Sequence, residues 1–272
     1  MIISSQNTNA QTSSIFEHVD QSYPISDYMD KELLVGDYGL HFTLGTGFVR
    51  YELSHTHLPK EDYSALKTGL FNSTYDHLEV RATLLDKPLI VGLNEPVHIA
   101  PKSHSHLSLS RPIAFQIVVK NSEEDLTLFS HAANELRLTC YGEITHPMVC
   151  YHSVSDILRP IENEKALDLI PGNHALVPLF IENQTKEPIE LRKLILYRGL
   201  LKLYRSKLCF ITNGVKVVIH SKSDAFIEYE EGPPSALGDL DLLFESNEEK
   251  VPRLLKRLRL RHSRGTGIEY GF

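Results

Sequence analysis

The chain has 272 residues, of which 42% are hydrophobic, and a formal net charge of −7 at neutral pH. This composition suffices for a sizeable core, and the sequence has no apolar run near the ~20 residues that a membrane-spanning helix needs. Three cysteines without CxxC spacing argue against a disulfide framework and a thiolate zinc site, so a reducing, cytoplasmic location is expected.

The charges are unevenly distributed. Residues 250–264 include seven Lys and Arg residues and no Asp or Glu. The rest of the chain therefore has 21 basic and 35 acidic residues, a net charge of −14. An acidic body repels a polyanion, so nucleic acid ranks last among the partners that the basic segment suggests.

The first half of the chain is predicted to form one β lobe. Residues 1–32 have neither the basic nor the apolar region of a secretory signal, and we predict an N-terminal arm and lead-in. In residues 33–155, short aromatic and aliphatic runs alternate with glycines and prolines, which mark bulges and strand ends. Residues 156–170 are charged and poor in β-formers, and they are the predicted linker.

Residues 171–245 are predicted to form a second β lobe around a β-meander that runs from His174 to Tyr229. Asn213-Gly214 separates two β-rich runs, and this dipeptide favours the two-residue type I′ turn of a hairpin. Turn signals recur every ~8–12 residues along the chain, without alternating helices. The sequence therefore predicts an all-β fold of two β-sandwich lobes.

Residues 246–272 are predicted to form a basic amphipathic helix and a tail. Ser246 and Glu249 match a capping box, and the apolar residues from Val251 to Leu258 lie on one helical stripe. Packing of this stripe on a sheet explains the pattern, and so does docking to a protein partner or an anionic membrane. The candidate partner-binding residues are Arg253, Lys256, Arg257, Arg259 and Arg261.

Two pairs of histidines have the spacing that puts both side chains on one face of a strand: His55 with His57, and His104 with His106. Each pair is a candidate site for a divalent metal, as in a metal-dependent β-barrel enzyme. Neither pair is followed by an acid at a cupin-like spacing, and a solvated strand face shows the same alternation. The sequence contains no nucleophile elbow, P-loop or dinucleotide fingerprint, so it predicts no catalytic residue.

Several strand phrases occur in order: GDYGLHF, LNEPVHIAPKSHSHLSLSRPIAFQIVV, LRLTCYGEITHPMVCYHS and HALVPLFIENQTKEPIELRKLIL. In these phrases, over residues 33–230, the chain resembles the family called domain of unknown function 432, which is found mainly in archaea. The resemblance implies a shared β architecture. It implies no activity and no catalytic residue.

Together these observations favour a non-catalytic, cytoplasmic interaction or assembly module without a cofactor. It is expected to bind a protein partner, and an anionic membrane surface is a further candidate location. Two alternatives remain open. One is a metal-dependent enzyme that uses the paired histidines, and the other is a structural homo-oligomer.

Overall fold

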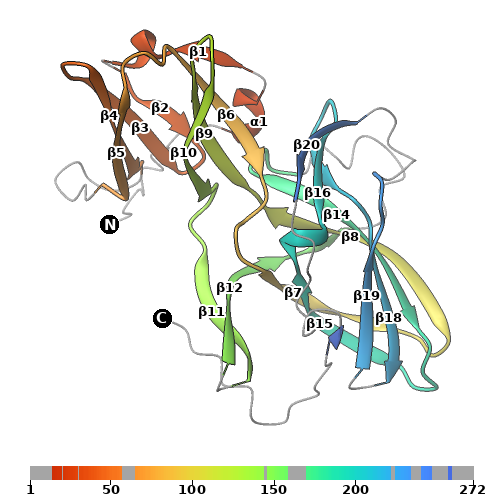
Figure 1. Ribbon diagram of the computed structural model, residues 1–272. Helices are drawn as coiled ribbons and strands as arrows, with labels where there is room; N and C mark the ends of the chain where they lie inside the picture. The colour runs from red at the N-terminus through yellow and green to blue at the C-terminus, as the bar shows by residue number, and fades with distance from the viewer. Residues whose placement is uncertain are drawn as a thin grey trace, which may run out of the picture. The chain divides into compact units, whose positions relative to one another are not determined.

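In the computed structural model, nearly all regular secondary structure of the described residues is β-strand (Figure 1), which confirms the all-β prediction. Short helical turns occur at α1 (Ile15–His18), η1 (Ile25–Tyr28) and η4 (Arg198–Leu200). The structure describes residues 14–19, 21–29, 31–56, 65–143, 146–158, 170–221, 224–233, 240–246 and 257–258.

The chain divides into two compact units, each made of two stretches of sequence. Unit 1 contains residues 1–81 and 116–133, and unit 2 contains residues 82–115 and 134–272. The two stretches of each unit are therefore separated along the chain by residues of the other unit.

This division differs from the predicted contiguous lobes, 33–155 and 171–245. Two long strands of the first predicted lobe, β7 (Leu89–Ile99) and β8 (Ser103–Pro112), pair with β15 and β14 of the second. Such non-local pairing leaves no mark in local composition, so a boundary search along the sequence does not detect it. Most of the predicted linker, 159–169, lies outside the described residues.

Unit 1 contains two four-stranded sheets, one in the order β2-β3-β4-β5 and one in the order β1-β6-β9-β10. Buried rings from both sheets meet, because Tyr51 of β4 stacks on Phe129 of β10 with 5.5 Å between ring centroids. The strands are β1 (Ser22–Pro24), β2 (Leu33–Val35), β3 (Tyr38–Leu44), β4 (Phe48–His55), β5 (Lys67–Asn72), β6 (His77–Thr83), β9 (Ala114–Lys120) and β10 (Asp125–Ala132).

The predicted N-terminal lead-in is partly a packed element of unit 1. Ile15 is fully buried, and Tyr23 of β1 lies opposite Leu78 of β6. A three-residue strand is too short to give a periodic pattern, which explains why the sequence did not indicate it. Residues 1–13 of the predicted arm lie outside the described part of the chain.

The bend between β2 and β3 requires glycine. Gly36 has a φ of +63°, and a Cβ atom there would lie 2.3 Å from the carbonyl oxygen of Ala133. A side chain is therefore excluded both by the left-handed backbone and by the close approach of β10's end. Gly36 therefore lies at one of the strand ends that the glycines of this region predicted.

Unit 2 contains a four-stranded sheet in the order β11-β12-β7-β15 and a nine-stranded sheet in which β14 is central. β14 (His174–Asn183) pairs with β8 over ten positions and with β17 and β18 along its other edge (Figure 1). The other strands are β11 (Arg137–Glu143), β12 (His146–Ser155), β13 (Ile157–Leu158), β15 (Ile189–Leu196), β16 (Lys202–Arg205), β17 (Phe210–Thr212), β18 (Val215–Ser221), β19 (Asp224–Tyr229), β20 (Asp241–Glu245) and β21 (Arg257–Leu258).

The strands of the predicted meander exist, but the predicted hairpin at Asn213-Gly214 is wrong. β17 and β18 do not pair with each other; both run parallel to β14, one after the other. From Leu176 to Leu179 the partner strand advances from Ile211 to Val215, so it has one extra residue. Gly214 has a negative φ, which excludes the type I′ turn.

Asn213 is used as a buried hydrogen-bonding hub instead of a turn residue. Its side chain is 1% exposed. Its Oδ1 accepts a hydrogen bond from the Lys202 N–H (2.8 Å), and its Nδ2 donates to the carbonyl oxygens of Leu200 (3.0 Å) and Glu230 (2.6 Å). One amide thus satisfies backbone groups of two other segments, and this contribution outweighs the turn preference of the dipeptide.

We predict that Asn213→Ala lowers the free energy of unfolding by about 2–4 kcal/mol, because three partly buried backbone groups lose their partner. Urea denaturation measures this change. Asn94→Ala is the matched control, since Asn94 is exposed and its amide donates a hydrogen bond to the carboxylate of Asp156. Equal losses in the two variants would contradict the role assigned to Asn213.

The predicted C-terminal helix is not supported where the structure describes it. Arg257 and Leu258 form strand β21, which pairs antiparallel with Ala225 and Phe226 of β19. A sheet edge offers hydrogen-bond partners to this segment, and helical periodicity alone does not account for that competition. The other residues of the predicted helix, 247–256 and 259–262, lie outside the described residues.

Candidate functional site

The structure places the predicted metal-binding histidines in different units. His55 ends β4 in unit 1, where its ring lies 5.1 Å from that of Tyr38. His57 lies outside the described residues, whereas His104 and His106 are on β8 in unit 2. Within the described ranges, no group of three or more His, Cys, Asp or Glu side chains is arranged to hold a metal ion.

His104 and His106 share one exposed face of β8, as the spacing predicted. Both rings pack against Phe180 of β14, at centroid distances of 5.6 and 4.8 Å. The Lys216 ammonium lies 5.9 Å from the centre of the same phenyl ring. The two imidazoles are therefore members of an aromatic cluster on the sheet surface. Metal binding by this pair stays a prediction, and metal analysis of the wild type and of the double alanine variant would decide it.

A hollow of about 440 Å³ lies beside this cluster. Its polar atoms are largely engaged in holding the adjacent turns: Lys102 Nζ donates to the Gln184 carbonyl, and Ser103 Oγ donates to the Ala100 carbonyl. Asn183, which is fully buried, donates to the same Ala100 carbonyl and to the carbonyls of Ile99 and Glu187. These contacts give Lys102, Ser103 and Asn183 a structural role. Its lining residues are Lys102, Ser103, His104, Phe180, Glu182, Asn183, Gln184 and His220.

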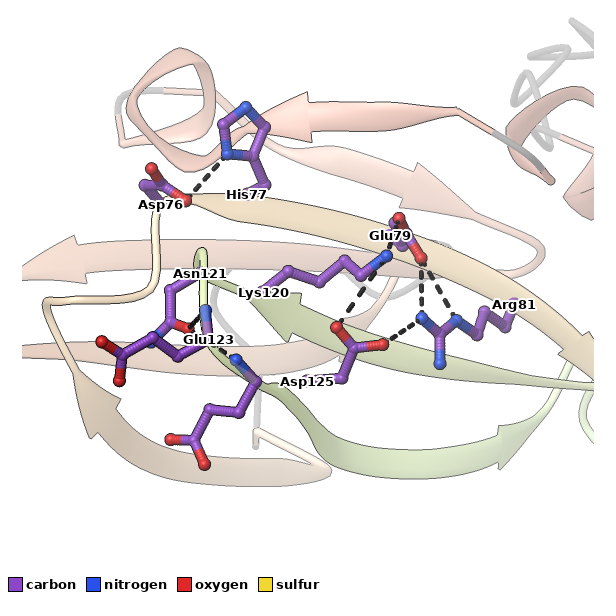
Figure 2. Close-up of polar contacts among 9 residues, drawn as sticks. Asp76, His77, Glu79, Arg81, Lys120, Asn121, Glu123 and Asp125 are labelled. Atoms are coloured by element: carbon purple, nitrogen blue, oxygen red, sulfur yellow. Dashed lines mark hydrogen bonds and ion pairs between the residues drawn. The ribbon is translucent and has the colours of Figure 1, made fainter.

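A four-membered charge network crosses three neighbouring strands of unit 1 (Figure 2). The carboxylate of Glu79 on β6 lies 2.7 Å from Lys120 Nζ of β9 and 2.9 Å from Arg81 Nη2. The carboxylate of Asp125 on β10 forms ion pairs with the same two cations, 2.6 Å from Arg81 Nη2 and 3.8 Å from Lys120 Nζ. Each charge thus lies between two charges of opposite sign, which ties the three strands together.

The network holds both of its carboxyl groups in the ionised form. Burial alone would raise the pKa of Glu79, but hydrogen bonds and positive charge from Lys120 and Arg81 outweigh it and lower the pKa. The hydrogen bond from Arg81 is the main cause of the lowered pKa of Asp125. A general acid near neutral pH needs a raised carboxyl pKa, so this paired arrangement indicates a structural clamp.

We predict that the network stabilises unit 1 at neutral pH and loses this effect in acid. A carboxyl group whose pKa is lowered by folding contributes stability above its unfolded pKa, and the contribution disappears as the pH falls through the folded pKa. Glu79→Gln should therefore lower the urea midpoint at pH 7, and the difference from the wild type should shrink below pH ~4. Glu123→Gln, an exposed acid nearby, is the control. A difference that grows in acid would contradict this assignment.

The side chains of the five predicted basic docking residues lie outside what the structure describes. Arg253, Lys256, Arg259 and Arg261 lie outside the described residues, and of Arg257 the structure gives its place in β21. Their role in partner binding stays a prediction.

An interaction feature that sequence analysis missed lies at the edge of the four-stranded sheet of unit 2. β11 ends the strand order and is paired on one side by β12. Leu138 and Val149 are 41% and 44% exposed. The register places Leu138 opposite Tyr151 and Cys140 opposite Val149, so these four residues share one face. A signal was present in the sequence: the strand RLTCYGE begins with a basic and ends with an acidic residue.

The opposite edge of the same sheet, β15, is built differently. Its pairing with β7 contains a register shift between Leu191 and Lys193, and the intervening Arg192 is exposed. Irregular pairing and exposed basic side chains are common protections of sheet edges. The ladder of β11 with β12 runs in regular register from Arg137 to Glu143, without a register shift.

The comparisons with known proteins identify a family. The model of a family described as "Protein of unknown function (DUF432)" matches residues 23–260, which include the 33–230 stretch of the predicted resemblance. No curated protein and no solved structure matches the chain. None of the helices that the structure describes has the length and apolar character required to cross a membrane.

Proposed function

The chain belongs to the DUF432 family, a family of unknown function, and we propose that it is a non-catalytic assembly module whose protein partner is a second copy of the same chain. The edge strand β11 carries this proposal. In the proposed assembly, two copies of β11 pair antiparallel about a two-fold axis, so that each four-stranded sheet continues into the other.

The sequence of β11 is complementary to itself in this arrangement. A two-fold axis at Cys140 places position 137 opposite position 143 of the other copy, and position 138 opposite position 142. Arg137 then lies at the position that pairs with Glu143, and this happens twice by symmetry. Opposite charges at directly paired strand positions stabilise antiparallel pairing, each by ~0.2–1 kcal/mol.

Burial of apolar surface supports the same arrangement. Leu138 and Val149 are partly exposed side chains on one face beside the edge, and a continued sheet would cover part of that face. An edge strand with regular pairing and exposed apolar neighbours is a template for another strand. The self-complementary charges favour a second copy, because an antiparallel copy of the same strand supplies the opposite charge at both positions.

The chemistry of the described residues supports a role without catalysis. The paired carboxylates of unit 1 are neutralised by Lys120 and Arg81. Burial raises the pKa of the Cys150 thiol to about 11, which makes it a poor nucleophile at neutral pH. Cys140, Cys150 and Cys209 are free thiols, and this supports the predicted cytoplasmic location.

The proposal predicts that Arg137→Glu and Glu143→Arg each convert the dimer to a monomer, because each substitution creates two like-charged pairs at the two-fold interface. An equimolar mixture of the two variants should restore a dimer, since every pair then regains opposite charges. Light scattering coupled to size-exclusion chromatography measures the masses.

Arg192→Glu on β15 is the control, and it should remain dimeric. Mild oxidation should cross-link the wild type through Cys140, which faces itself across the axis, and should not cross-link Cys140→Ser. Opposed residues in antiparallel strands have Cα separations that a disulfide can span. A monomeric wild type at high concentration, or a mixture that stays monomeric, would overturn the proposal.

A further inference from the structure

Unit 2 contains a fully buried arginine. Arg111 is 0% exposed and lies on β8 opposite Ala175 of β14. In the register of this sheet its side chain shares a face with Leu109 and Val177, both of which are buried in the core. Because both Arg111 and the paired Ala175 are 0% exposed, the guanidinium lies in the interior of unit 2.

The guanidinium of Arg111 has unsatisfied hydrogen-bond donors. Both Nε and Nη1 of Arg111 are buried and make no hydrogen bond with any described residue. The group whose charge acts on Arg111 is the phenol of Tyr229. Its oxygen accepts a hydrogen bond from the backbone N–H of Tyr197 at 3.1 Å.

Neither ionisable group removes the charge. Burial lowers the pKa of Arg111 to about 10, which leaves it protonated at neutral pH. Burial raises the pKa of Tyr229 to about 12, although the Tyr197 hydrogen bond and the charge of Arg111 act in the opposite direction. The phenol is therefore neutral and supplies no counter-charge. Among the described residues of unit 2, no counter-charge to Arg111 is present.

An isolated charge in a protein interior is very costly unless it is paired and hydrogen-bonded. Breaking a buried ion pair by removing one partner costs ~3–5 kcal/mol, because the other charge remains uncompensated. Arg198 differs from Arg111: only its Nε is a buried donor without a partner, the residue is partly exposed, and its guanidinium lies 5.0 Å from the centre of the Phe244 ring. Arg111 Nε and Nη1 are thus buried cationic donors for which the described residues of unit 2 provide no acceptor.

We propose that Arg111 binds a small oxyanion, a carboxylate or an inorganic phosphate, as a built-in part of the folded core of unit 2. Guanidinium donors match the oxygen spacing of these anions, and charge-assisted hydrogen bonds to them are about twice as strong as neutral ones. The bound anion satisfies Nε and Nη1 and neutralises the charge. This site is independent of the β11 edge and of the proposed assembly.

The test is the thermal melting of the full chain in chloride, acetate and phosphate at one ionic strength. An anion that binds the folded chain alone raises the midpoint as its concentration rises, by about 5 °C near saturation for a chain of this size. Acetate and phosphate distinguish a carboxylate site from a phosphate site. The wild type should respond to one of them and not to chloride.

Arg111→Met should abolish this response, whereas Arg192→Met, an exposed arginine on β15, should keep it. Arg111→Lys keeps the charge but loses the planar donor geometry, so its response should be reduced. This variant preserves the test if the methionine variant does not fold. A wild type that is insensitive to both oxyanions, or equal responses in the Arg111 and Arg192 variants, would overturn the proposal.

Discussion

The architecture of unit 2 depends on the pairing of β14. This strand is paired along both edges, antiparallel with β8 and parallel with β17 and β18. Its inward residues, such as Val177 and Ile181, are fully buried. A strand with no free edge and a buried face fixes the register of its neighbours, because a shift of one residue would expose their apolar side chains.

Buried asparagine side chains add hydrogen bonds to those of the strand pairing. Asn183 ends β14 and donates to carbonyl oxygens of the turn after β7, so it joins the two sheets of unit 2. Asn213, between β17 and β18, plays a similar role. Its amide bonds to Lys202 at the start of β16 and to Glu230 just after β19. Both side chains satisfy several backbone groups at once, and this explains why polar residues occupy such buried positions.

The charged residues of the two units have contrasting environments. In unit 1, Glu79 and Asp125 share Arg81 and Lys120 at the surface, and every charge has a partner (Figure 2). In unit 2, Arg111 is buried without an acceptor among the described residues. The first arrangement is complete within the chain. The second is not, and the proposed oxyanion would supply the missing acceptor.

The sequence by itself determined the all-β class and most strand positions, because alternation and turn residues act locally. It also placed His104 and His106 on one face of a strand, since that follows from strand geometry alone. It did not indicate the ring of Phe180 between them, which comes from a strand more than 70 residues away in the chain.

Tertiary structure alone decided which strands pair and which ionisable groups are compensated. Asn213-Gly214 has the local chemistry of a hairpin, but β14 provides a parallel partner to both flanking strands, and the buried amide favours that outcome. Likewise, nothing in the sequence around Arg111 distinguishes it from a surface arginine. Strand pairing and burial depend on residues that are distant in the sequence, so local propensity does not reveal them.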